Sequence, residues 1–459
     1  MRYVQRGIGI WSSRVAESYA KQQCSRGSNS LVLISDSFPF GTGEEFLEDE
    51  IVYLAEQFHS IVIVAVRADD TMLQSRSIPS NVRAFAGRSS RSTKVTWESG
   101  DQFIKGAVKL CRVFPSIVNG WRRIGDGVRS PLAFLQSVRF EASAQLVFRR
   151  IVRAVTLPPS DLSGCVVVYS YWFHLTARVG ELLLERIRIC NPGVSTVFLT
   201  RAHGYDLYHH RSRSGCLPQR RHLLAAVDSI SCVSEHGRRY LAGLYPEYVS
   251  KFFVDRLGTR SPQPKADISR KSLRITSCSG IVAVKRLTLI PAVLQRLVDE
   301  GLDPVWTHIG DGPDRLVLED LIRAYGLQER VTLIGHVPHD ELFYRLASIP
   351  TTLFINLSSS EGAPVSLMEA MSQGIPVVAT DVGGTGEIVF DKQTGRLVSA
   401  DARTEDVVSA IRWIWELEQT KFEQMQSACR RLWSERYFGE RNYSAFALSL
   451  AERCPEPGV

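Results

Sequence analysis

Short apolar runs alternate with helical patterns along most of the chain, and the runs fall into two series. The first series of predicted strands comprises Leu31–Ser35, Ile61–Val66, Val82–Ala86, Val166–Ser170, Thr196–Thr200 and Asp228–Val233. The second comprises Leu273–Ser277, Pro304–Ile309, Arg330–Ile334, Thr352–Leu357, Ile375–Thr380 and Arg396–Val398. Because helical patterns such as Asp314–Tyr325 fall between the strands, each series predicts a parallel, doubly wound α/β sheet.

The stretch between the two series, GTRSPQPKADISRK (258–271), is rich in proline and charge and lacks periodicity. It predicts an interdomain linker at 259–271, and 459 residues suit two domains of roughly 200 residues each. We therefore expect two Rossmann-like domains, residues 30–258 and 272–435, that face each other across a cleft. A final helix within residues 436–459 is expected to pack back on the first domain.

The composition narrows the class of protein. An apolar fraction of 44% and a charged fraction of 22% are typical of a soluble globular chain, and no run approaches the ~18 apolar residues of a membrane helix. Residues 1–29 lack a clear apolar core, so we interpret them as a polar extension and not as a secretion signal. The nine cysteines show no zinc spacing and no CxxC pair. Cys165, Cys232 and Cys278 lie in apolar runs, which predicts reduced core thiols and a cytoplasmic location.

The net charge of +7 is unevenly distributed. Residues 102–155 contain ten Lys or Arg against two acidic residues, a net charge of +8, interleaved with aromatic residues. Such a segment suits an anionic membrane surface, here the inner face of the cell membrane, or an acidic partner. The alternative is a pair of ordinary solvated helices with an apolar inner face. No nucleic-acid partner is expected, because no reading motif accompanies the charge.

The stretch 358–389 (SSSEGAPVSLMEAMSQGIPVVATDVGGTGEIV) predicts a loop, a helix and a strand that follow a buried strand. This is a βαβ unit, and its loop lies at the carboxyl end of the strand, where open α/β sheets bind ligands. Glu361 in the loop and Glu369 in the helix are eight residues apart. The free N–H groups at the start of the helix favour an anion such as phosphate.

The first series carries a similar loop, DSFPFGTG (36–43), between a strand and a helix. Gly41, Thr42 and Gly43 allow close approach to a phosphate, although the loop lacks the GxGxxG spacing. His203 follows another strand in RAHGYD (201–206), and His174, Arg201 and Asp206 are further strand-end candidates. For each of these residues the alternative is a structural role in a strand-end turn.

Several motifs together resemble the retaining nucleotide-sugar glycosyltransferases of family 4, which have the GT-B fold. In the second half these are GIVAVKRL (280–287), IGDGP (309–313), VTLIGHVPHDEL (331–342), the pair Glu361 and Glu369, and PVVATDVGGTGEIV (376–389). In the first half, FPFGTGEEFLEDEI (38–51), YSYWFHLTA (169–177), RAHGYDLY (201–208) and VSEHGRRYL (233–241) resemble members that build bacterial surface polysaccharides such as lipopolysaccharide or exopolysaccharide.

The resemblance implies roles for individual residues. Lys285 would contact the donor diphosphate, Glu369 the ribose hydroxyls and Glu361 the donor sugar. Two acceptor oxygens make a carboxylate suitable for a vicinal diol. His203 would touch the sugar and the leaving group, so Glu361, His203 and Lys285 are the predicted catalytic residues.

Further residues are implied in binding the nucleotide sugar: Gly362, Ala363, Val365, Gly310, His336, Val337, Gly383, Gly384, Gly41, Thr42 and Gly43. Of these, His336 and Val337 would line the base slot. Relatives often carry an arginine five positions before the lysine, but here that position is Gly280, so Arg286 is the expected substitute.

The resemblance implies a metal-independent enzyme without a cofactor. It would transfer a sugar from a UDP- or GDP-sugar to a saccharide or lipid-linked acceptor, by same-face attack with retention of configuration. Two alternatives stay open. One is another GT-B enzyme, such as a UDP-sugar epimerase or a phosphorylase, and the other is a non-enzymatic sugar-binding protein with two lobes.

Overall fold

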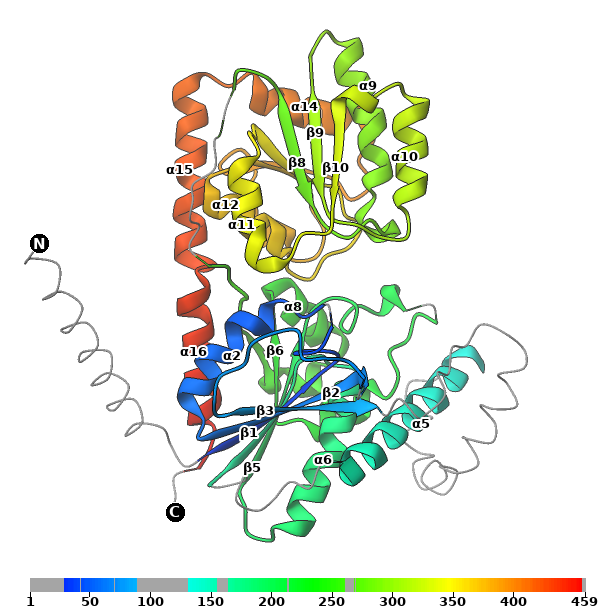
Figure 1. The fold of residues 1–459 in the computed structure, drawn as a ribbon, viewed down its shortest axis with the longest axis vertical. Helices are drawn as coiled ribbons and strands as arrows, with labels where there is room; N and C mark the ends of the chain where they lie inside the picture. Colours follow the sequence, from blue (N-terminus) through cyan, green and yellow to red (C-terminus); the bar gives the residue numbers. More distant parts are fainter. Residues whose placement is uncertain are drawn as a thin grey trace, which may run out of the picture.

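The computed structural model describes residues 29–41, 43–69, 71–88, 131–154, 164–212, 214–260, 268 and 270–455. Within them the chain forms two α/β domains, drawn one above the other in Figure 1, and every strand pairing is parallel. The predicted architecture of two Rossmann-like sheets is therefore confirmed. Residues 1–28, 101–130 and most of 259–271 lie outside the described residues, so the extension, much of the basic segment and the linker stay predictions.

The first domain contains a seven-stranded sheet of order β3-β2-β1-β4-β5-β6-β7. Its strands are β1 (Ser30–Ser35), β2 (Ser60–Asp69), β3 (Val82–Arg88), β4 (Val166–Ser170), β5 (Thr196–Ala202), β6 (Ser229–Cys232) and β7 (Phe252–Val254). Its helices are α2 (Phe46–Gln57), α5 (Pro131–Ala154), α6 (Leu175–Cys190), α7 (Arg220–Ala226) and α8 (Glu235–Leu244). The three-residue edge strand β7 was not predicted, because so short a run carries no periodicity.

Alternate residues of the central strands face opposite sides of this sheet. On β1, Val32 and Ile34 belong to a core with α5 and α6, whereas Leu31 and Leu33 belong to a core with α2 and the last helix, α16 (Gly439–Glu452). Both faces are therefore covered, which explains why the central strands are apolar over most of their length.

The second domain contains a six-stranded sheet of order β10-β9-β8-β11-β12-β13. Its strands are β8 (Arg274–Cys278), β9 (Val305–Ile309), β10 (Val331–Gly335), β11 (Leu353–Asn356), β12 (Val377–Thr380) and β13 (Gly395–Val398). Its helices are α9 (Ile290–Asp299), α10 (Arg315–Ala324), α11 (His339–Ser348), α12 (Val365–Gln373), α13 (Thr385–Ile388), α14 (Thr404–Trp415) and α15 (Gln419–Arg436).

The two domains are tied together at the end of the chain, where α15 packs on α12 of the second domain and α16 packs on α2 of the first (Figure 1). Phe446, Ala447 and Leu450 of α16 pack in the same core as residues of α2. At the crossing, the amide of Thr259 donates to Tyr437 and the amide of Gly439 donates to Thr259, both at 2.9 Å. The two segments that connect the domains, at Thr259 and at 437–439, are thus hydrogen-bonded to each other.

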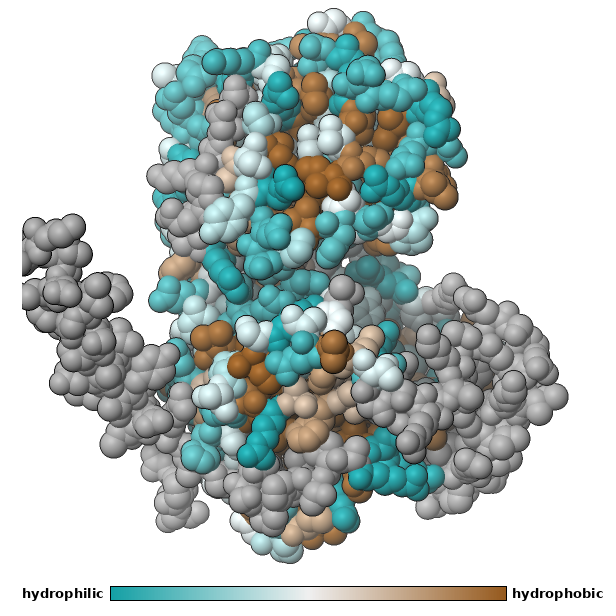
Figure 2. Space-filling view, viewed as in Figure 1, coloured by the Kyte–Doolittle hydropathy of each residue, from teal (hydrophilic) through white to brown (hydrophobic). Residues whose placement is uncertain are grey.

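Each sheet reverses its strand order at one point, between β1 and β4 in the first and between β8 and β11 in the second. Loops at such a reversal diverge and leave a crevice at the carboxyl ends of the strands. The two reversal points face each other, because residues after β1, β8 and β11 line one cavity between the domains. On the face drawn in Figure 2, hydrophilic residues predominate where the domains meet.

Candidate active site

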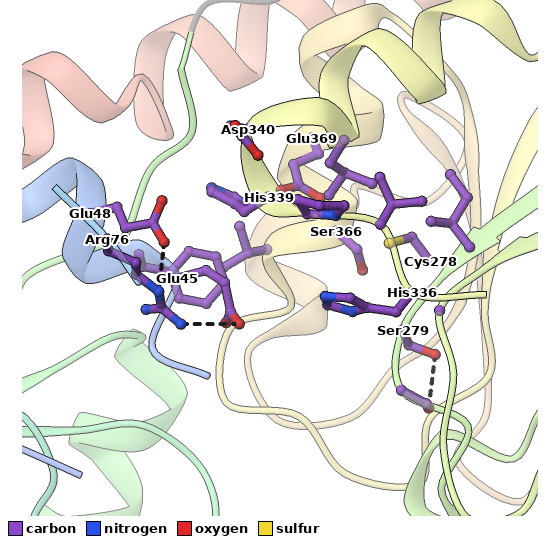
Figure 3. A pocket seen from close by; sticks show the side chains of 18 of the residues that line it. Glu45, Glu48, Arg76, Cys278, Ser279, His336, His339, Asp340, Ser366 and Glu369 are labelled. Carbon is purple, nitrogen blue, oxygen red and sulfur yellow. Dashed lines mark hydrogen bonds and ion pairs between the residues drawn. The ribbon is translucent and has the colours of Figure 1, made fainter. Parts of the chain in front are cut away.

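A cleft of about 1170 Å³ lies between the two domains. Its second-domain wall comes from the loops after β8, β9, β10 and β11 and from α11 and α12, and its first-domain wall from α2 and residues 75–79. Figure 3 shows side chains from both walls pointing toward one another. The predicted residues that line it are Gly41, Lys285, Gly310, His336, Val337, Glu361, Ala363, Val365 and Glu369. Most of the predicted second-domain site is therefore gathered in one cavity.

Lys285 and Glu361 form an ion pair in this cleft. Lys285 ends a short 3-10 turn (Ala283–Lys285) after β8, and its Nζ lies 2.6 Å from Oε1 of Glu361. The same oxygen accepts a 3.3 Å bond from the amide of Asn356 at the end of β11. Both side chains are more than three-quarters buried, so the pair is little screened. An anion that enters the cleft would compete with Glu361 for the lysine.

Glu369 lies in the second turn of α12 and is only 3% exposed. Burial raises the pKa of its carboxyl to about 7, and the nearby His339 partly opposes this, whereas Asp49 and Glu45 of the first domain add to it. The imidazole Nδ1 of His339 lies 4.0 Å from Oε1 of Glu369. The carboxylate faces the cavity, where hydroxyl donors would favour its ionised form.

Three predicted glycines contact protein, and none of them lines the cleft. A Cβ on Gly383 would lie 1.8 Å from the carbonyl oxygen of Glu361, and one on Gly384 would lie 2.2 Å from that of Gly362. A Cβ on Gly362 would lie 2.4 Å from the carbonyl oxygen of His203 in the other domain. The absence of a side chain at these glycines therefore allows the close packing of the Glu361 loop and of the two domains.

Arg286 occupies a different position from the one expected. Its backbone is left-handed, with φ of 49°, and its guanidinium donates to the carbonyls of Leu357 (2.6 Å), Ser358 (3.2 Å) and Ala400 (2.7 Å). It does not line the cleft. The arginine thus holds the loop after β11, and Gly280 lines the cleft without a replacement from this residue.

His203 lies at the junction of the domains, behind Glu361 and Gly362. Its ring packs on Trp172 with centroids 4.3 Å apart, and its Nδ1 is 3.8 Å from Oδ2 of Asp206. Asp206 is fully buried and accepts from the amides of His203 and Phe173, so its role is structural. His203 itself does not line the cleft.

Of the remaining first-domain candidates, some line the cleft and others do not. Gly41 lines the cleft but Gly43 does not, and Thr42 lies outside the described residues. Arg201 is buried, paired with Glu50, and stacked 4.0 Å from the ring centroid of Phe446 on α16. It joins elements of the fold and does not contact the cleft.

The cysteine predictions hold with one exception. Cys165 and Cys232 are buried free thiols, as expected, but Cys278 is only partly buried and lines the cleft at the end of β8.

Glu44 organises the loop that ends at the cleft. Its carboxylate accepts from the amides of Asp36 (2.7 Å), Ser37 (2.7 Å) and Phe38 (2.8 Å) and from the indole N–H of Trp172 (2.7 Å). Four donors on one carboxylate form a strong, geometrically specific cluster. The loops after β1 and β4 are thereby held together beside His203.

Sequence reasoning missed the acidic and basic groups of the first-domain wall. Arg76 donates to Glu48 at 2.9 Å, lies 3.9 Å from Glu45, and is 10% exposed (Figure 3). Arg76 falls in an irregular segment that gives no periodic signal, whereas Glu45 and Glu48, three residues apart at the start of a helix after β1, could have been noticed. His339, which lies beside Glu369, was also missed. It is the first residue of α11, and the resemblance to family 4 implied no role for it.

Residues 263–431 match the family model described as "Glycosyl transferases group 1". This part of the chain therefore resembles the group 1 glycosyltransferases. The match covers the second sheet and most of α15, and therefore includes Lys285, Glu361 and Glu369.

Curated relatives extend the match into the first domain. The chain is 24% identical over 377 residues to the colanic acid biosynthesis glycosyltransferase WcaL of Salmonella typhimurium, covering 79% of this chain and 84% of the relative. Its identity to WcaL of Escherichia coli is 30% over 239 residues, which span 50% of this chain and 57% of that protein. The 2-deoxystreptamine glucosyltransferase of Streptomyces kanamyceticus is 27% identical over 157 residues, which span 34% of this chain and 39% of that protein.

Solved structures agree on the fold of the chain. Sucrose-phosphate synthase of Thermosynechococcus elongatus superposes with a TM-score of 0.65 at 15% identity, covering 92% of this chain and 98% of that one. HepE of Anabaena, in complex with UDP and glucose, gives a TM-score of 0.61 at 14% identity, covering 92% of this chain and 100% of that one.

In the described part of this chain, none of the helices is long and apolar enough to cross a membrane.

Proposed function

We propose that the protein is a glycosyltransferase that moves a sugar from a nucleoside-diphosphate sugar to a hydroxyl of a saccharide or lipid-linked saccharide, in cell-surface polysaccharide biosynthesis. One observation carries the proposal. A single cavity between two opposed sheet edges holds a buried carboxylate (Glu369), a cation (Lys285) and the start of α12. Ribose, diphosphate and sugar need these three kinds of group side by side. The WcaL relatives, named for colanic acid biosynthesis, support the pathway class.

The donor is UDP- or GDP-linked in this proposal. The base lies against His336 and Val337, the ribose hydroxyls donate to Glu369, and the diphosphate lies between Lys285 and the N–H groups at the start of α12. The solved complex of HepE with UDP and glucose supports UDP as the first nucleotide to test.

The reaction is proposed to be retaining and independent of metal, as in family 4. The acceptor oxygen attacks the anomeric carbon from the face that the diphosphate leaves, the carbon–oxygen bond to the β-phosphate breaks, and the acceptor proton passes to a phosphate oxygen. Lys285 and the helix N–H groups stabilise the charge that develops on the leaving diphosphate. Glu361, released from Lys285 by the diphosphate, faces the positive charge on the sugar.

The decisive experiment is a donor screen. Nucleotide-induced thermal shift with UDP, GDP and ADP identifies the base, because a ligand at 100 times its Kd adds ~2.7 kcal/mol to the free energy of unfolding. Nucleotide release is then measured with each donor sugar, with and without saccharide acceptors, and with EDTA. Conversion of a UDP-sugar without any acceptor would instead identify an epimerase. No shift and no release with any nucleotide sugar would refute the proposal.

We also propose a location at the inner face of the cell membrane, through the basic segment 102–155. Its described part, α5, exposes Leu132 and Leu135 near the exposed Arg139. Co-sedimentation with anionic but not neutral liposomes is the expected result. Equal binding to both kinds of vesicle, or to neither, would contradict electrostatic attachment.

A further inference from the structure

A second cavity, of about 530 Å³, lies wholly within the first domain. It is lined by Arg67 of β2, residues 136–143 of α5, the start of α6 and parts of the segment 205–218, and it shares no lining residue with the cleft. We call it the arginine cavity, after Arg67, Arg139 and Arg211, which line it together with His174 and Tyr205. The arginine cavity is separate from the proposed binding site of the donor and its diphosphate.

The charge of the arginine cavity is one-sided. Three arginines line it, and its described lining includes neither Asp nor Glu. Asp36 lies 3.2 Å from Arg67 and outside the lining, so it partly neutralises that arginine. Burial lowers the pKa of His174 to about 4, which leaves its imidazole neutral at physiological pH. A partly enclosed site lined by several guanidinium groups attracts an anion.

Ring contacts connect the arginine cavity to the junction of the two domains. The ring of Tyr205, in the cavity wall, lies 4.9 Å from that of Trp172, which lies 4.3 Å from that of His203. The backbone of His203 touches Gly362, next to Glu361 of the cleft. Tyr205 and Trp172 are both partly exposed, and aromatic faces of this kind stack on the apolar faces of sugar rings.

We propose that the arginine cavity is a subsite for an anionic group of the acceptor. The group is the phosphate of a lipid-linked saccharide or the carboxylate of an acidic sugar, since both accept paired N–H bonds from arginine. The saccharide then extends along Tyr205 and Trp172 toward Glu361. The proposal rests on the proposed glycosyl transfer, because only a transferase has an acceptor to bind.

The first test measures binding without catalysis. The protein is titrated calorimetrically with geranyl diphosphate against geraniol, and with methyl glucuronide against methyl glucoside, while UDP and GDP saturate the cleft. At least one anion should bind and its neutral partner should not, and the anion that binds identifies the source. The double variant Arg139→Ala/Arg211→Ala should raise the Kd about tenfold or more. Arg186→Ala, an exposed arginine on α6, is the matched control and should keep the wild-type Kd.

The second test separates this proposal from the proposed function. With an active donor and acceptor pair, the double variant should raise the acceptor KM about tenfold, with a far smaller change in donor KM. Anion binding that is absent, or unchanged in the double variant, would overturn the subsite. If the wild type turns over no nucleotide sugar, glycosyl transfer fails by itself, and the titration still decides whether the cavity binds anions.

Discussion

Replacing Glu369 with glutamine should stabilise the free protein while weakening nucleotide binding. The carboxyl is 3% exposed and its pKa is raised by burial from 4.5 to about 7. A raised carboxyl pKa means that the folded protein prefers the protonated form, so its contribution to stability is fully present below pH 4.5 and is lost as the pH rises through 7. Glutamine resembles the protonated acid at every pH and escapes this loss.

The magnitude follows from the shift. A change of about 2.5 pKa units corresponds to roughly 3 kcal/mol, so at pH 8 Glu369→Gln should be about 3 kcal/mol more stable than the wild type. At pH 5 the gain should fall below about 1 kcal/mol. Urea unfolding at the two pH values measures both numbers. Glu435→Gln, an exposed position on α15, is the control and should change stability little at either pH.

Nucleotide affinity should move in the opposite direction. If ribose hydroxyls donate to the ionised Glu369, the Kd for the nucleotide rises as the pH falls below about 7, by up to tenfold per pH unit. In Glu369→Gln the Kd should be higher and nearly independent of pH. A variant that is no more stable than the wild type at pH 8, or that binds nucleotide with wild-type pH dependence, would refute the reasoning about this carboxylate.

Three further substitutions test the rest of the site. Lys285→Ala should lower kcat/KM for the donor about 100-fold, since the leaving diphosphate loses its cation; a loss below tenfold in nucleotide release would contradict the assignment. Gly383→Ala, whose Cβ would lie 1.8 Å from a carbonyl oxygen, should abolish activity and destabilise the protein more than Gly326→Ala. Gly326 also has positive φ but open space around it, so only backbone strain of about 1–2 kcal/mol is expected there by urea unfolding. Glu44→Gln should cost about 1–3 kcal/mol, because four donors lose a full carboxylate; an unchanged free energy of unfolding and unchanged Trp172 environment would show that the cluster does not stabilise the loop.

The fold could be predicted because burial of the strands leaves a clear apolar pattern in the sequence. Strands such as β1 and β4 are buried on both faces, so their residues are apolar without a break and separate clearly from the helices. The second-domain site was predictable for a related reason. Lys285 and Glu361 follow strand ends and Glu369 lies in the helix after one of them, and the parallel sheet brings strand ends to one edge.

What the sequence could not supply was the direction of side chains and the distance between domains. Arg286 follows Lys285 directly, yet its left-handed backbone turns the guanidinium to carbonyls behind the loop. Gly383 signals that something approaches closely, but only the structure identifies the partner as the Glu361 loop. Arg76 lines the same cleft as Glu369 only because two separately folded sheets are held across it, and no local pattern records that placement.

The packing of α16 on the first domain affects the order in which the two domains can fold during translation. Domains usually fold as they emerge, the N-terminal one first. Here Phe446, Ala447 and Leu450 complete a core whose other members emerge hundreds of residues earlier. Until those side chains leave the exit tunnel, the neighbouring face of α2 and its sheet stays open to solvent. The domain that is synthesised first is therefore finished last, and it needs protection from aggregation throughout translation of the second.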